Sequence, residues 1–232
     1  MKNYICILIL LLIAPAVFAN EAFFPTEKGM TQLTANLNSN GRIEGYNLMA
    51  VKDVKVSGND ITVIYTVQIL DRNRKPDSKA GEREYSVKIN AGVLEFELKN
   101  MMDAFFAAQN MNYTLTDSKL FIPSGMAPGS KLRDAWMKIV VNVPIIGSVT
   151  ADVAMTDIVC AGIETVTVPA GTFEAYKVTQ TSTTVTKGWI KPTVINTGVT
   201  WYVRGIGVVK TISYDDKGKV ESSAELHELK RK

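Results

Sequence analysis

The sequence predicts a mainly β fold: a curved antiparallel sheet or open barrel, connected as a meander, with one amphipathic helix. Two observations support this prediction. From Gly45 onward, apolar and polar residues alternate in short runs that turn-forming residues separate. One segment, near residue 100, instead has apolar residues at helical spacing. No low-complexity linker divides the chain, so we expect a single β-rich domain over 20–232; two halves meeting near 123–130 are the alternative.

The first nineteen residues have the pattern of a secretory signal peptide. A short positive start precedes an unbroken apolar run over 5–13, and a small-x-small cleavage site ends at Ala19. The run is too short for a permanent transmembrane helix, so we expect cleavage after Ala19 and a periplasmic or secreted protein without an integral membrane span. A retained membrane anchor is the alternative. No cysteine follows the cleavage site, so a lipid anchor is not expected.

Alternation predicts two hairpins in the first part of the mature chain. In the first, Ser57-Gly58-Asn59-Asp60 forms the turn between two apolar-alternating runs. In the second, a turn at 90–92 joins two further runs, and the polar stretch between the hairpins is an exposed loop. The predicted strands are 51–56, 61–69, 85–89 and 94–98, and the loop is 71–84.

A helix is predicted over 98–110, because Leu98, Met102 and Phe106 recur at helical spacing together with their apolar neighbours. This apolar face would pack on the sheet, as Met and Phe on such helices commonly do. It could also line a pocket for a hydrophobic ligand. Both interpretations stay open on sequence alone. The candidate pocket residues are Met102, Phe105, Phe106, Met126 and Trp136.

Strands resume after the helix, first around the turn Thr116-Asp117-Ser118 and then, beyond an irregular loop at 123–130, to the end of the chain. We interpret Val168-Pro169-Ala170-Gly171 as a hairpin turn that needs positive φ at Gly171 to close a bulged hairpin, and 215–218 as a second turn of the same kind. The predicted strands are 112–116, 119–122, 135–143, 148–156, 160–168, 172–181, 183–190, 198–204, 208–214 and 220–229.

The composition excludes several functional classes. Loss of the signal peptide removes only Lys2 from a formal charge of +3, so the mature chain is nearly neutral and no nucleic-acid partner is expected. The mature chain has one histidine, His227, which alternation places on the solvated side of the last strand, and one cysteine, Cys160, expected to be buried. Neither hydrolytic triads nor zinc sites can be assembled from these two residues. We therefore expect no enzyme activity, no metal and no cofactor.

Three segments resemble the TapB-like, DUF3108-related group of exported bacterial proteins of unknown function. They are 164–177 (ETVTVPAGTFEAYK), 200–210 (TWYVRGIGVVK) and 214–219 (YDDKGK), and Phe121-Ile122-Pro123 followed by 129–135 is similar too. The resemblance implies a β-rich exported domain and carries no catalytic residues. It is compatible with a non-enzymatic protein that binds a hydrophobic or lipid-like small molecule or another envelope protein. A structural or surface-interaction module with a closed core is the alternative.

Overall fold

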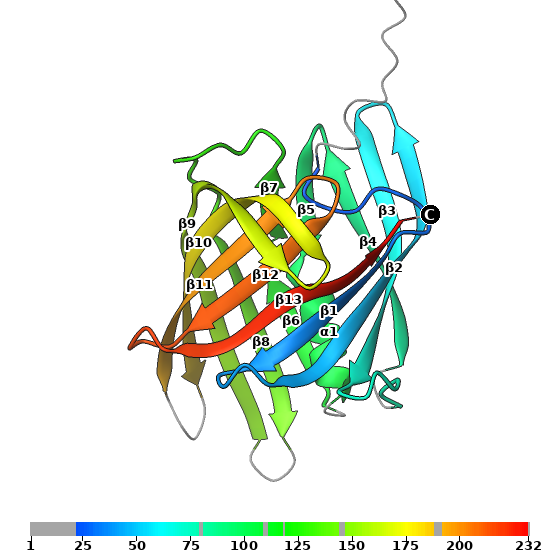
Figure 1. The fold of residues 1–232 in the computed structure, drawn as a ribbon. Coiled ribbons are helices and arrows are strands. Elements are labelled where there is room, and N and C mark those ends of the chain that lie inside the picture. Colours follow the sequence, from blue (N-terminus) through cyan, green and yellow to red (C-terminus); the bar gives the residue numbers. More distant parts are fainter. Residues whose placement is uncertain are drawn as a thin grey trace, which may run out of the picture.

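A computed structural model describes residues 22–231 except 79–80, 109–110, 118, 144–146 and 188–191, so the predicted signal peptide lies outside the described residues. The described chain is almost entirely strand, with one helix (Figure 1). The strands are β1 (Thr31–Asn38), β2 (Ile43–Ser57), β3 (Asp60–Asp71), β4 (Glu82–Asn90), β5 (Val93–Glu97), β6 (Tyr113–Asp117), β7 (Lys119–Pro123), β8 (Ala135–Val143), β9 (Gly147–Val168), β10 (Gly171–Lys187), β11 (Thr193–Val203), β12 (Gly207–Tyr214) and β13 (Val220–Lys230), and the helix is α1 (Leu98–Ala108).

The described strands form one antiparallel sheet in the order β6-β8-β9-β10-β11-β12-β13-β1-β2-β3-β4-β5-β7. Most neighbours are consecutive in sequence, as in a meander. β13 pairs with β1 and thereby joins the two ends of the chain in the middle of the sheet. The sheet curves around α1 without closing, and β6 and β7 are its edges (Figure 1). The predicted curved antiparallel sheet with one helix is therefore confirmed.

β6 and β7 differ from the sequence expectation. Both segments are strands, as predicted, but they do not pair across the turn that separates them. β6 pairs with β8 and β7 pairs with β5, so these neighbours in sequence lie at opposite edges of the sheet. The predicted turn includes Ser118, which lies outside the described residues, and the structure shows that Asp117 and Lys119 on either side belong to strands at the two edges of the sheet.

The interior of the curved sheet is filled by the chain itself. The segment before β1 places Phe23 and Met30 inside, at 1% and 2% exposure. The loop between β7 and β8 adds Met126 and Leu132, also buried. These side chains form one cluster with inward-facing residues of the sheet, including Cys160, whose predicted burial is confirmed at 0% exposure.

The hairpin of β9 and β10 is longer than its neighbours, and its tip folds over the outside of β12 and β13 (Figure 1). A second apolar cluster fills the space beneath, with Val166 and Ala175 from the hairpin packed near Trp201 and Leu226. The Ala170 N–H donates a hydrogen bond to the Leu226 carbonyl oxygen at 3.1 Å and fixes the tip to β13. The two strands bend where their register shifts, between Lys177 and Val178.

Gly171 has a φ of +144°, as the turn interpretation requires. It pairs directly with Val168, so the hairpin closes without the bulge that we expected there. Pro169 and Ala170 therefore form a two-residue loop. Gly171 directly follows this loop, and glycine can adopt a positive φ there because it has no Cβ atom.

Candidate functional site

None of the predicted pocket residues lines either of the two hollows described below. Phe106 is buried and stacks on Tyr113 at 4.4 Å between ring centroids, which fixes α1 to β6. Met126 belongs to the interior cluster, and Met102 is half-buried on α1. Trp136 faces outward from β8 at 51% exposure. The side chain of Phe105 lies outside the described part of the structure.

The concave face is apolar at one end and polar towards the other. Val178 belongs to the interior cluster, and Gln180, two residues further along β10, lies on the same face. The cross-strand partners of Gln180 are all small or polar, so this row across β10 to β1 offers no apolar lining. They continue over four neighbouring strands as Gly198, Ser213, Ser222 and Asn38.

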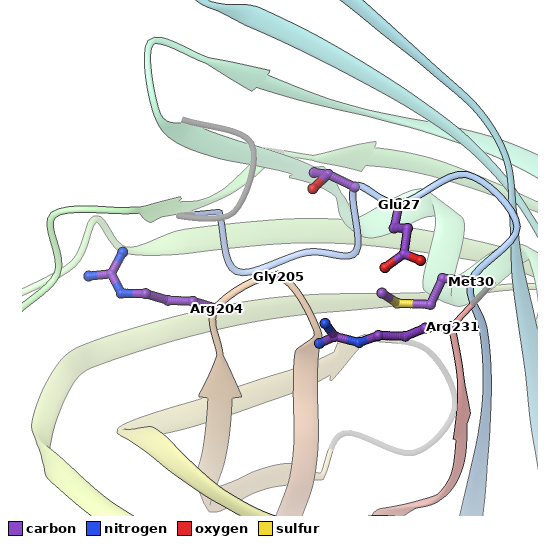
Figure 2. A pocket seen from close by; sticks show the side chains of 6 residues that line it. Glu27, Met30, Arg204, Gly205 and Arg231 are labelled. Carbon is purple, nitrogen blue, oxygen red and sulfur yellow. The ribbon is translucent and has the colours of Figure 1, made fainter. Parts of the chain in front are cut away.

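One hollow of about 230 Å³ lies where the segment before β1 meets the turn between β11 and β12. We call it the terminal hollow. Figure 2 shows the Glu27 side chain directed towards Met30, and the Arg231 side chain running towards the turn at Gly205. Its lining is mainly polar, so it does not suit a hydrophobic ligand. The lining residues are Thr26, Glu27, Met30, Arg204, Gly205 and Arg231.

Arg204 at this hollow has a structural role. Its Nε and Nη2 donate to the Tyr176 hydroxyl at 3.2 and 3.1 Å. The guanidinium also lies 5.1 Å from the ring centroid of Phe23 and 5.0 Å from that of Tyr176. These contacts connect the segment before β1 to β10 and β11, because cations are attracted to aromatic faces at this distance.

A second hollow, of about 190 Å³, lies on the outer face of β13, β1, β2 and β3. We call it the leucine hollow. Leu48 follows the same face as Leu33, its cross-strand partner, while the next residue, Met49, packs on the interior cluster. The leucines of the floor therefore point away from the interior. The lining residues are Thr31, Leu33, Leu48, Leu70, Arg74, Glu228 and Lys230.

Charged side chains form the rim of the leucine hollow. The Glu228 carboxylate accepts from Arg74 Nη1 at 2.6 Å and lies 3.3 Å from Lys230 Nζ. Hydrogen bonds from Arg74, and then from Lys230, hold the pKa of Glu228 below its ordinary value. The pKa of Arg74 is raised, because the Tyr46 hydroxyl and the Glu228 carboxylate accept its hydrogen bonds. Both shifts favour the charged forms.

The loop after β3 holds Arg74 over this hollow. The Asp71 carboxylate accepts from the N–H groups of Asn73 and Lys75 at 2.8 and 2.9 Å, and Arg74 has a φ of +62°. The turn places the Arg74 guanidinium 5.2 Å from the centre of the Tyr46 ring. We expected an exposed loop here, and its position against β2 is a feature that sequence reasoning missed.

His227 is also placed differently from our expectation of a solvated side chain. It is half-buried with its ring 5.6 Å from that of Tyr46, and its Nδ1 is buried with no hydrogen-bond partner among the described residues. A register shift between Leu33 and Thr34 of β1 makes His227 an extra residue on β13, and this breaks the simple alternation.

The described residues contain no group of three or more His, Cys, Asp or Glu side chains arranged to hold a metal ion. Cys160 is buried beneath the sheet, and burial raises the pKa of its thiol. None of the helices in the described ranges is long and apolar enough to cross a membrane.

Comparison with known proteins identifies a family and a fold. Residues 27–226 match the model of the DUF3108-like family. A protein from Bacteroides fragilis, described as exported and as having a YmcC-like fold, is 19% identical with a TM-score of 0.73; the match covers 90% of this chain and 99% of that one. A protein from Parabacteroides distasonis, described as a lipoprotein, is 21% identical with a TM-score of 0.72 over 90% and 98% of the two chains. No curated protein matches the sequence.

Proposed function

The chain belongs to the DUF3108-like family, and from that premise we propose that it is a non-enzymatic, exported cell-envelope protein that binds a hydrophobic, lipid-like molecule. The observation that carries the proposal is the leucine hollow. Its floor is apolar and lies on the outer face of the sheet, beside charged side chains. A shaped apolar surface with a few placed polar groups is the usual form of a small-molecule site.

The filled interior supports this location for the ligand. Phe23, Met30, Met126 and Leu132 occupy the space that a carrier with an internal cavity would leave empty. The polar row that begins at Gln180 makes that part of the concave face a poor lining for an apolar molecule. We therefore place the ligand outside the sheet.

Export to the periplasm or beyond is supported by the pattern of the first nineteen residues. It agrees with the descriptions of the two structural neighbours, one as exported and one as a lipoprotein. Since Asn20, and not a cysteine, directly follows Ala19, we propose a protein without a lipid anchor.

The non-enzymatic part of the proposal rests on the two residues most suited to catalysis. The ring of His227 packs on Tyr46, and Cys160 is enclosed in the interior cluster on the other side of the sheet. An imidazole and a thiol so placed cannot act on one substrate.

The test is a lipid-extract pulldown on the mature protein, residues 20–232, with recovered molecules identified by mass spectrometry. We expect a lipid-like species above the level of an unrelated β-sheet protein, and its loss in Leu48→Asp, which puts a charge on the apolar floor. Lys28→Asp, an exposed change outside the hollow, is the matched control. Recovery of nothing above background would refute ligand binding.

A second candidate is an interaction module with a closed core, which the filled interior also favours. Its partner would bind the outer surface, where Trp136 on β8 and Ile195 on β11 are 51% and 49% exposed. A photo-crosslinking residue at each of these positions, in cells, should capture the same envelope protein. Capture of no protein at either position would remove this candidate.

A further inference from the structure

We propose that the leucine hollow binds a free single-chain amphiphile with an anionic head, such as a carboxylate, and that the rim cations select for the negative charge. This inference rests on the proposed function, because it specifies which lipid-like molecule the hollow accepts. Three properties of the site carry it: its size, the charge of its rim and the rigidity of the loop that carries Arg74.

The size of the hollow selects for a slender ligand. Its volume is about 190 Å³, whereas pockets that enclose a whole drug-sized ligand measure roughly 300–1,000 Å³. The floor is made by three leucines, of which Leu33 and Leu70 are 6% and 7% exposed. Only part of one acyl chain fits against such a floor, so the head must lie at or beyond the rim.

The charge of the rim selects for an anion. The two cations Arg74 and Lys230 share the single carboxylate of Glu228, and this leaves a formal excess of one positive charge at the mouth of the hollow. The loop that bears Arg74 has Asp71 and Asp77 as its carboxylates and Arg72 and Lys75 as further cations. An anionic head placed here would meet cations that are 48% and 74% exposed in their side chains, so little desolvation opposes the contact.

The loop needs little reorganisation to receive the head. Asp71 closes it through two backbone N–H groups, and the Asp71 N–H donates to the Lys75 carbonyl oxygen at 2.8 Å. The Arg74 guanidinium already lies over Tyr46. A cation that is ordered before binding costs less conformational entropy when the ligand arrives.

The experiment compares three ten-carbon amphiphiles below their micelle concentrations: decanoate, the neutral decyl maltoside and the cationic decyltrimethylammonium. Isothermal titration calorimetry on the mature protein measures each dissociation constant. We expect decanoate to bind about fivefold more tightly than decyl maltoside, the ratio that corresponds to about 1 kcal/mol from an exposed ion pair. The preference should shrink as salt is raised.

Two variants assign the preference to the rim. Arg74→Gln combined with Lys230→Gln should bring the affinities for decanoate and decyl maltoside together, while Lys28→Gln, an exposed cation outside the hollow, should keep the preference. Circular dichroism and urea unfolding establish that each variant is folded. A preference for decanoate that survives in the double variant would overturn the proposal.

The outcomes separate this inference from the proposed function. Equal binding of all three amphiphiles, abolished by Leu48→Asp, would keep a hydrophobic ligand and reject anion selection. Tighter binding of decyltrimethylammonium would reject it as well, in favour of Glu228 as the determinant. Binding of none of the three would reject both the inference and ligand binding at this hollow.

Discussion

Replacement of Phe23 by alanine tests whether the segment before β1 is part of the core. Phe23 is 1% exposed, and its ring meets those of Tyr176 and Tyr202 edge-to-face at centroid distances of 4.9 and 6.0 Å. The Arg204 guanidinium lies 5.1 Å from the centre of the Phe23 ring and 5.0 Å from the centre of the Tyr176 ring. The substitution therefore removes apolar area, two aromatic contacts and one cation–π contact at once.

The expected cost is about 4 kcal/mol, within the range of roughly 3–5 kcal/mol for Phe→Ala in a packed core. With an m-value of about 2 kcal/mol/M in urea, the midpoint of unfolding should fall by about 2 M without a change in slope. Equilibrium urea unfolding of the mature protein, followed by tryptophan fluorescence and circular dichroism, measures both quantities.

Lys28→Ala in the same segment is the control, because Lys28 makes only an exposed ion pair with Asp53 and should change the stability by less than about 1 kcal/mol. A loss below about 1 kcal/mol for Phe23→Ala would refute the reasoning. It would mean that the segment before β1 contacts the sheet but does not fill its interior. The interior would then have room for a ligand.

Three further predictions concern single residues. Gly171→Val should lower the free energy of unfolding by about 1–3 kcal/mol through backbone strain at a φ of +144°, and an unchanged thermal midpoint would contradict this. Because the pKa of Glu228 is lowered in the folded state, its contribution to stability is present above the pKa of the unfolded chain and is lost as the pH falls through the folded-state pKa. NMR titration should find that Arg74→Gln raises the Glu228 pKa; no change would argue against the ion pair. Cys160 should be inert to a thiol reagent in the native protein and react fully in urea, whereas rapid native labelling would show that it is accessible.

Most strands and the helix could be predicted from local patterns because each pattern reports on its own element, but β1 and the part of β2 before Val51 were missed, and β9 and β10 were each predicted as two strands. Alternation along 61–69 corresponds to β3, and helical spacing from Leu98 corresponds to α1, which ends at Ala108 in the structure. Positive φ at Gly171 follows equally from a local turn. These features depend on residues that are close together in the sequence.

The features that sequence reasoning missed depend on residues that are far apart. The leucine hollow combines side chains of β1, β2, β3 and β13, and one of its two cations, Arg74, comes from a loop with no local signal other than polarity. The tip of the β9–β10 hairpin packs on β12 and β13 only because both of its strands bend where their register shifts. The position of His227 likewise results from a register shift against β1, which no pattern within β13 reveals.

The pairing of β1 with β13 has a consequence for the order of events in folding. Thr31 lies opposite Lys230, so these partners are separated by almost the whole chain. The sheet cannot be completed until β13 has left the ribosome. Contacts of such long range require loop closure before they add stability, which makes folding slow. A nascent chain would therefore complete its tertiary structure only after release.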